Sequence, residues 1–155
     1  GKSLIAQNLA HQAVIQGHSA LFINAAQMLG DLAAQDGDNA LRRRFAHYAR
    51  PDVLVIDEIG YLSYGNRHAD LLFEIVNRRY EHKPTIITTN RPFAEWSEVF
   101  PNAACVVSIV DRLVHHAEIL VIEGESYRMR EAKQRAAKKK NIKSKQRRNP
   151  PEPTE

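Results

Sequence analysis

The sequence lacks several features that would place it in a particular class of protein. Its single cysteine, Cys105, excludes a framework of internal disulfides and is typical of a reducing compartment. No apolar run approaches the roughly 20 residues that cross a bilayer, and no stretch has the pattern of a secretory leader. No internal repeat is visible. We therefore expect a cytoplasmic protein without membrane association.

A starting methionine is also missing. The chain begins Gly1-Lys2-Ser3, so we expect it to be a fragment of a longer protein. Its 155 residues suffice for one domain with a core, but not for two. The 43% hydrophobic and 26% charged residues are those of an ordinary globular domain.

Positive charge is concentrated near the carboxyl end. Residues 1–127 carry eleven Lys or Arg against fifteen Asp or Glu, whereas residues 128–149 carry eleven Lys or Arg and one Glu. We expect a folded domain over 1–127 and a basic tail over 128–155, helical at first and disordered by Pro150. Such a tail favours a polyanion such as nucleic acid, although a solvated segment that only aids solubility is the alternative. The candidate phosphate contacts are Lys138, Lys139, Lys140, Arg147 and Arg148.

The stretch Val53–Glu58 consists of four apolar residues followed by two carboxylates. The apolar part, rich in β-branched residues, is typical of a strand buried on both faces of a parallel sheet. Ligands of such sheets bind at the carboxyl edge. There Asp57 would hold Mg²⁺, and Glu58 would orient or deprotonate an attacking water, as in a Walker B element. Taken alone, the pattern equally fits a buried strand followed by a solvated acidic turn.

The first three residues have the form of the end of a P-loop. Gly1-Lys2-Ser3 leads into apolar residues spaced like one face of a helix, which Gly17 can end. Backbone N–H groups and the helix dipole would receive phosphate there, Lys2 would reach the β- and γ-phosphates, and Ser3 would bind Mg²⁺. Three residues are a weak signal, since this tripeptide occurs by chance in many chains.

Strands and helices alternate along the chain, which predicts a parallel sheet with right-handed crossovers. The predicted strands are 19–24, 53–56, 85–90 and 117–122; the predicted helices are the segment between Ser3 and Gly17, then 25–35, 40–49, 69–80, 93–100 and 106–116.

Several polar residues have two interpretations each. Asn90, at the end of strand 85–90, either holds the attacking water or the γ-phosphate, or only caps the following turn. The arginines at 42–44 form either a solvated helix face or a contact with DNA or a neighbouring subunit. His115 and His116 are adjacent on a helix, so we expect them to point to different faces and to be poor metal partners. Trp96 is expected in the core.

The order and spacing of five segments resemble the IstB-like proteins, AAA+ helper ATPases of insertion sequences that are related to the DnaC helicase loader. The resemblance implies a P-loop NTPase fold with an AAA+ core. It also implies a bacterial ATP hydrolase that assembles on DNA and recruits a transposase; phosphate contacts by the basic tail would make the DNA binding independent of sequence. The segments are Gly1–Ser3, Val53–Tyr61, Thr88–Trp96, Asp111–Leu113 and Gly124–Arg128.

The resemblance also assigns roles by position. Gly1, Lys2 and Ser3 match Walker A, and Asp57 and Glu58 match Walker B. Asn90 matches sensor 1, Arg112 matches an arginine finger that reaches the γ-phosphate of the next subunit, and Arg128 matches a sensor-2 arginine. A finger supplied in trans implies a homo-oligomer, with ATP and Mg²⁺ as cofactors.

The sequence departs from the family pattern at its start. The first strand of the sheet and the leading glycine of the P-loop would precede Gly1, and that strand would lie between the strands ending at Asn90 and Glu123. We therefore expect this fragment alone to bind ATP poorly. Two other functions stay open: a replicative helicase loader, which would share the catalytic residues, and an inactive or merely DNA-binding remnant.

Overall fold

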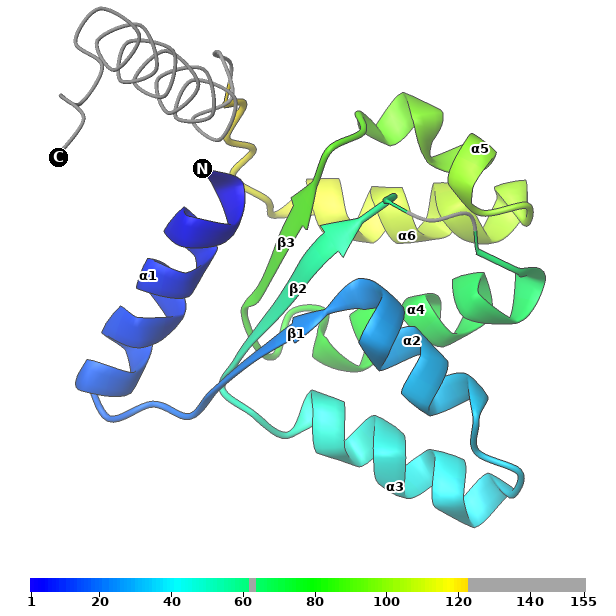
Figure 1. The fold of residues 1–155 in the computed structure, drawn as a ribbon, viewed down its shortest axis with the longest axis horizontal. Helices are drawn as coiled ribbons and strands as arrows, with labels where there is room; N and C mark the ends of the chain where they lie inside the picture. The colour runs from blue at the N-terminus through cyan, green and yellow to red at the C-terminus, as the bar shows by residue number, and fades with distance from the viewer. Residues whose placement is uncertain (62–63, 123–155) are drawn as a thin grey trace, which may run out of the picture. The chain divides into compact units, whose positions relative to one another are not determined.

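A computed structural model describes residues 1–61 and 64–122, whose arrangement is shown in Figure 1. The chain divides into Gly1–Leu120 and Val121–Glu155, and only the first two residues of the second unit are described. The predicted boundary after residue 127, Arg128 and the five basic tail residues lie outside the described residues. No helix in the described part of the chain is long and apolar enough to cross a membrane.

Within residues 1–61 and 64–122, three parallel strands form a sheet in the order β1–β2–β3. Strands β1 and β2 pair from Ala20 opposite Val53 to Asn24 opposite Asp57. A helical segment connects each strand to the next, so the predicted parallel α/β fold is confirmed. The strands are β1 (Ala20–Asn24), β2 (Val53–Ile59) and β3 (Thr85–Thr89).

The central strand β2 is buried on both faces because its side chains alternate. Leu54 and Ile56 belong to the larger core, on the side of α2 to α6, whereas Val55 packs with Ala6 and Ala10 of α1. Leu54, Val55 and Ile56 are all 0% exposed. Burying side chains of this size contributes about 1.5–3 kcal/mol each, so β2 is a main source of stability.

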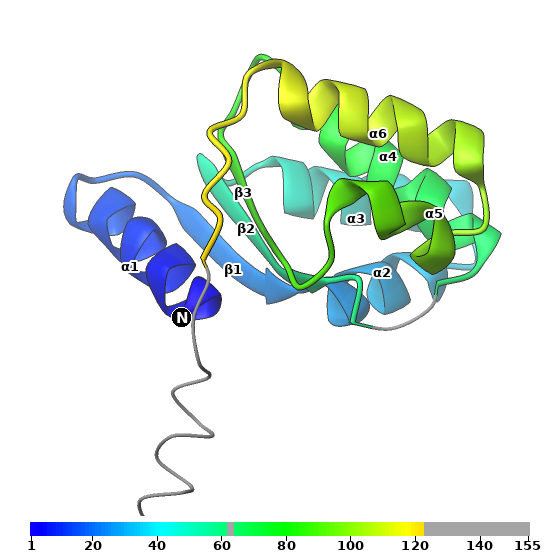
Figure 2. The ribbon, with the colours of Figure 1, turned by 90° about the horizontal axis from the view of Figure 1, so that it is seen from above.

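The helices lie on both faces of the sheet. Among the described residues, helix α1 covers one face and the remaining helices lie on the other (Figures 1 and 2). Gly17, with φ +90°, follows the end of α1 and allows the N–H of His18 to reach the carbonyl of Ala13, as predicted for a glycine that ends a helix. The helices are α1 (Lys2–Ile15), α2 (Ala25–Ala33), α3 (Asp38–Ala49), α4 (Asn66–Arg79), the 3₁₀ turn η1 (Phe93–Glu95), α5 (Trp96–Val99) and α6 (Ala103–His115).

Three helices begin earlier than predicted. Helix α3 begins at Asp38, whose carboxylate suits the positive end of the helix dipole, and α4 begins at Asn66. Helix α6 begins after Asn102, whose side chain accepts a hydrogen bond from the N–H of Cys105 at 3.2 Å. A polar capping side chain therefore sets the start of α6, whereas α3 and α4 begin directly after Gly37 and Gly65; the sequence prediction had followed the apolar residues.

The predicted strand over 117–122 is wrong. These residues are described, and they form no strand pairing. A strand exists only with a hydrogen-bonded neighbour, and among the described residues β3 pairs with β2 alone. Ile119 and Leu120 are accordingly 57% and 69% exposed.

Candidate active site at the carboxyl edge of the sheet

Strand β2 ends in a β-bulge that separates its two acidic residues. Ile56 pairs with Ile87 and Ile59 with Thr89, so β2 has one more residue than β3 between these pairs. Asp57 is buried, whereas Glu58 has φ 63° and is exposed. A bulge redirects a side chain, and a positive φ at a non-glycine residue costs about 1–3 kcal/mol. The strained backbone thus presents Glu58 to solvent beside a buried carboxylate.

A single threonine hydroxyl positions both acidic residues. The Oγ1 of Thr88, on β3, donates a hydrogen bond to Oδ1 of Asp57 and accepts one from the N–H of Glu58 at 2.9 Å. Thr88 is only 7% exposed. Its hydroxyl therefore holds one oxygen of Asp57 and the backbone of the bulge.

An asparagine holds Glu58 from the other side. The Nδ2 of Asn24, at the end of β1, donates to Oε2 of Glu58 at 3.0 Å, and its Oδ1 accepts from the N–H of Ala26 at 2.9 Å. The second bond caps α2, so the amide has one fixed orientation. Asn24 and Thr88 were not among the predicted site residues. Their positions could have been predicted from the sequence, because each is a polar residue at the end of a strand that flanks β2.

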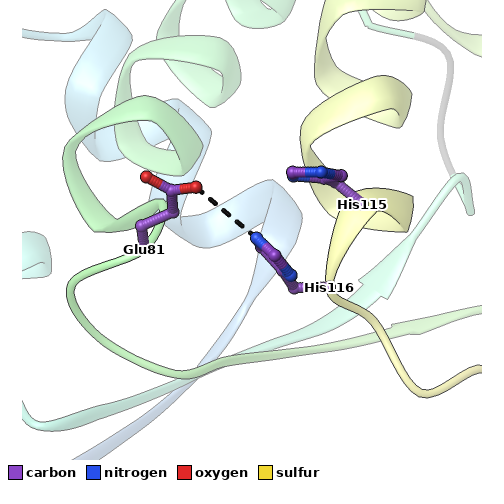
Figure 3. A group of neighbouring side chains, drawn as sticks. All are labelled: Glu81, His115 and His116. Atoms are coloured by element: carbon purple, nitrogen blue, oxygen red, sulfur yellow. Dashed lines mark ion pairs between the residues drawn. The ribbon is translucent and has the colours of Figure 1, made fainter.

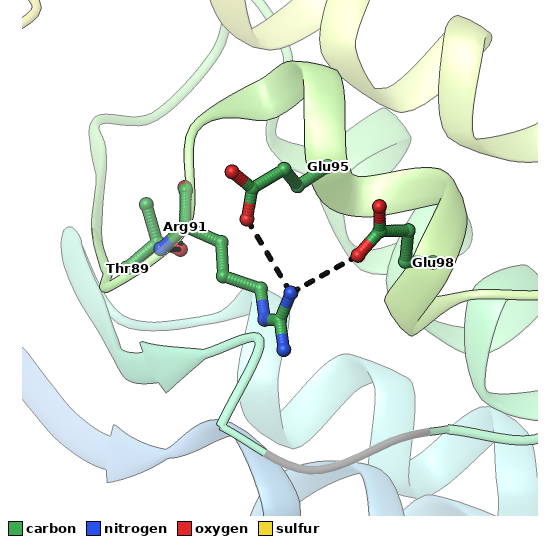
Figure 4. Close-up of polar contacts among 4 residues, drawn as sticks. All are labelled: Thr89, Arg91, Glu95 and Glu98. Atoms are coloured by element: carbon green, nitrogen blue, oxygen red, sulfur yellow. Dashed lines mark hydrogen bonds and ion pairs between the residues drawn. The ribbon is translucent and has the colours of Figure 1, made fainter.

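The turn that contains Asn90 is held by its neighbours. The Oγ1 of Thr89 accepts from the N–H of Arg91 and donates to the carbonyl of Arg91, both at 3.1 Å. The guanidinium of Arg91 pairs with Glu95 and Glu98, each at 3.3 Å (Figure 4). The side chain of Asn90 is exposed at this turn.

Asn90 lies close to the chain that follows Glu58. A β-carbon at Gly60 would lie 3.6 Å from Oδ1 of Asn90, and Gly60 has φ +89°. The structure thus brings Asn90 to the same edge as the acidic pair. Its sensor role stays a prediction.

The amino end of α1 points to this edge as well. In both views the N-terminus lies on the side of the sheet where the strand arrows end, since α1 runs antiparallel to the strands (Figures 1 and 2). No side chain caps α1, Lys2 is exposed and Ser3 is partly exposed. The start of a helix carries N–H groups without partners in the helix and a partial positive charge, which suit a phosphate.

Within its own chain, Arg112 does not lie with the residues at the carboxyl edge of the sheet. It lies in the last turn of α6, where its guanidinium carbon is 4.7 Å from the centre of the Phe73 ring and Nη1 donates to the carbonyl of Ser108 at 3.3 Å. The end of α6 lies beside the turn between α4 and β3, at the amino edge of the sheet. The finger role of Arg112 stays a prediction.

A helix start for phosphate and an acidic pair at one edge of a parallel sheet define an α/β domain of the P-loop NTPase class. A solved structure of a DNA replication initiation factor shares the fold, with a TM-score of 0.61 at 20% identity over 71% of this chain and 34% of that chain. The family model described as IstB-like ATP binding protein matches residues 1–136, and the chain belongs to this family.

The relatives found for this chain come from insertion sequences. A protein of insertion sequence IS5376 from Geobacillus stearothermophilus is 36% identical over 141 residues, which are 91% of this chain and 56% of that protein. A protein of insertion sequence IS21 from Pseudomonas aeruginosa is 38% identical over 141 residues, 91% of this chain and 53% of that protein. The chain therefore spans about half the length of the curated relatives it matches.

Proposed function

We propose that the chain is the ATP-binding part of an ATP-dependent helper protein of insertion-sequence transposition. The observation that carries the proposal is that the Gly-Lys-Ser start of α1 and the Asp57–Glu58 pair lie at the same edge of the sheet. Membership of the IstB-like family and relatives from insertion sequences support it.

The residues at this edge fit a magnesium nucleotide. Asp57 is a buried carboxylate with one oxygen held by Thr88, and carboxylate and hydroxyl oxygens are ligands that Mg²⁺ prefers. Asp57 and Ser3 would hold the cation, and Lys2 and the first N–H groups of α1 would hold the phosphates. When bound, Mg-ATP supplies a transferable phosphoryl group and a cation that offsets its charge.

The remaining groups act on water. Glu58 is exposed, and Asn24 and the bulge fix its position, so it can orient a water molecule and accept its proton. Asn90, on the neighbouring strand end, can donate a hydrogen bond to the same water or to a phosphate oxygen. Two groups on a rigid sheet edge keep that water in one orientation.

Assembly completes the proposal. Arg112 would leave its contact with Phe73 and act on the site of the next subunit, which requires a homo-oligomer. The tail residues Lys138–Lys140, Arg147 and Arg148 would contact DNA phosphates without sequence preference, and Arg128 would act as a second sensor. The assembly on DNA would recruit a transposase.

The test is Glu58→Gln in a protein of the full length of its relatives. The amide keeps the size of the side chain but cannot accept the proton, so ATP binding is retained while hydrolysis falls about 10²–10⁴-fold and the assemblies stay on DNA. Glu74 is a partly exposed glutamate of α4 paired with Arg78, and Glu74→Gln is the matched control, which keeps the parent rate. Parent-like turnover in Glu58→Gln removes Glu58 from the mechanism.

A second experiment separates this function from helicase loading. Affinity capture with the full-length protein, ATP and DNA is expected to retain the transposase of the same insertion sequence. Retention of the replicative helicase instead, with no transposase, would assign the chain to the loader class.

A further inference from the structure

A second group of polar side chains lies at the opposite edge of the sheet, where α4 turns into β3. Glu81 belongs to that turn, and His115 and His116 belong to the end of α6. One ligand atom from each lies within 4.8 Å of the other two, and all three residues are exposed. Figure 3 shows how the three side chains lie. None of them takes part in the function proposed above.

The prediction that the two histidines point to different faces is wrong. Helix α6 ends at His115, and His116 leaves the helix with φ −128° and ψ 19°. The two rings therefore come together, with their centres 4.0 Å apart. Helical spacing separates neighbouring side chains only inside a helix, and the sequence did not show that α6 ends between these two residues.

Glu81 occupies a backbone position that usually belongs to glycine. Tyr80 has φ −52° and ψ 129°, Glu81 has φ 59°, and the N–H of His82 donates to the carbonyl of Arg79 at 3.0 Å. These are the features of a type II turn with Glu81 at its third position, where glycine or asparagine avoids strain. A glutamate there costs about 1 kcal/mol or more, which indicates a role for its side chain.

The spacing of these groups suits a transition-metal cation. Nε2 of His116 lies 3.4 Å from Oε1 of Glu81. Two ligands of a tetrahedral zinc ion, each at its usual bond length, lie about 3.3 Å apart. The hydroxyl of Tyr80 is 2.5 Å from Nδ1 of His115, which orients this ring and leaves its Nε2 for a metal.

We propose that Glu81, His115 and His116 form a binding site for a divalent transition-metal cation of the zinc type. Two imidazoles and one carboxylate suit Zn²⁺, whereas Mg²⁺ prefers an octahedron of oxygens. Water takes the fourth position. The bound cation ties the end of α6 to the turn between α4 and β3, and thereby fixes the helical turn that carries Arg112.

The test is a calorimetric titration of the metal-free 155-residue chain with Zn²⁺ near neutral pH. We expect one saturable site, and a melting temperature about 5–10 °C higher when free Zn²⁺ is a hundredfold above Kd. Glu81→Gly removes the carboxylate and relaxes the turn. It should lower the affinity at least tenfold, while the melting temperature without metal stays the same or rises. His116→Asn should lower the affinity by a similar factor.

His82 provides the matched control, because it is an exposed histidine of the same turn that is outside the cluster. His82→Asn should bind Zn²⁺ as the parent does, and Mg²⁺ should not compete. The proposal is overturned if the parent has no saturable site, or if Glu81→Gly and His116→Asn both bind as tightly as the parent. An equal loss in His82→Asn also overturns it, because binding would then reflect exposed histidines in general.

Discussion

At the scale of single residues, one hydroxyl organises the acidic end of β2. Thr88 bonds both to the carboxylate of Asp57 and to the backbone of Glu58, and it is buried. A buried carboxylate without a partner is unfavourable. Thr88 therefore contributes to stability and to the alignment of the proposed cation ligand at the same time.

Replacing Thr88 by valine keeps the shape and removes the hydroxyl. We expect Thr88→Val to lower the free energy of unfolding by about 1–3 kcal/mol, because an oxygen of Asp57 and the N–H of Glu58 lose their partner. Urea denaturation measures the change. Thr88→Ser keeps the hydroxyl and should lose only about 1 kcal/mol for the missing methyl group. A valine variant as stable as the serine variant would show that the hydrogen bonds contribute little.

Because of Tyr48, the free energy of unfolding depends on pH in the alkaline range. Burial of the phenol and its 2.6 Å hydrogen bond to Oδ2 of Asp31 raise the pKa of Tyr48 to about 12. Burial also acts to raise the pKa of Asp31, but the hydrogen bonds from Tyr48 and Arg44 outweigh it and lower that pKa. Arg44, one of the three arginines of α3 with two interpretations, thus has an internal partner in Asp31 at 2.7 Å.

Because the native state holds the phenolic proton more tightly than the unfolded state, stability falls as pH rises between about 10 and about 12. Below this window the contribution of Tyr48 is fully present. Tyr48→Phe removes the proton and should flatten the fall in melting temperature across the window. An unchanged slope in this variant would assign the alkaline loss to other groups.

At the scale of elements, a buried arginine joins the loops at the amino edge of the sheet. Arg79, in the last turn of α4, is 1% exposed, and burial lowers its pKa. Its guanidinium links the end of α4 to the segments before β2 and β3. It donates to Oγ1 of Thr85 and to the carbonyls of Ala49, Pro51, Asp52 and Pro84 at 2.7–3.1 Å.

The single ammonium group of a lysine cannot make all the hydrogen bonds that the guanidinium of Arg79 makes. We expect Arg79→Lys to lower the free energy of unfolding by about 2–4 kcal/mol, since buried carbonyls lose their donors. Arg78→Lys is the matched control. Arg78 is a neighbouring, more exposed arginine paired with Glu74, so its replacement should change stability by less than about 0.5 kcal/mol. Equal effects in a chemical denaturation series would contradict the role of Arg79.

Sequence reasoning succeeded where local patterns suffice and failed where partners are distant. Apolar runs and helical spacing placed the three strands and most helices, and parallel topology predicted that polar strand ends share one edge. Arg78 and Arg79 look alike in the sequence, because burial depends on which loops lie above the helix. The bulge at Glu58 was equally hidden, since it exists only in the register between β2 and β3.

At the scale of the whole molecule, α1 keeps large apolar side chains exposed, and β3 has an open edge among the described residues. Only Ala6 and Ala10 of α1 are buried, and within the described residues the outer edge of β3 has no paired strand. An open strand edge leaves backbone groups without partners. The larger apolar residues of α1 that stay exposed are Leu4, Ile5, Leu9, Val14 and Ile15.

We expect this 155-residue chain to bind Mg-ATP poorly by isothermal titration. Of the P-loop pattern this chain carries Gly1, Lys2 and Ser3, and the position of α1 rests on the two buried alanines Ala6 and Ala10. A chain extended at its amino end by a strand and a glycine-rich loop, as the family pattern implies, should reach micromolar affinity. Micromolar affinity in the chain of 155 residues itself would refute this expectation.

The sequence by itself determined the alternation of strands and helices and the polar residues at the strand ends, because both depend on local periodicity. The tertiary structure alone decided the contacts between these elements. Thr88 and Asn24 bond to the acidic pair, Arg79 bonds to the loops at the amino edge, and Glu81 pairs with His116. Most of those contacts join residues 27 to 35 positions apart. Their geometry follows from the register between the strands and from the end of α6 at His115, and neither was predicted from the sequence.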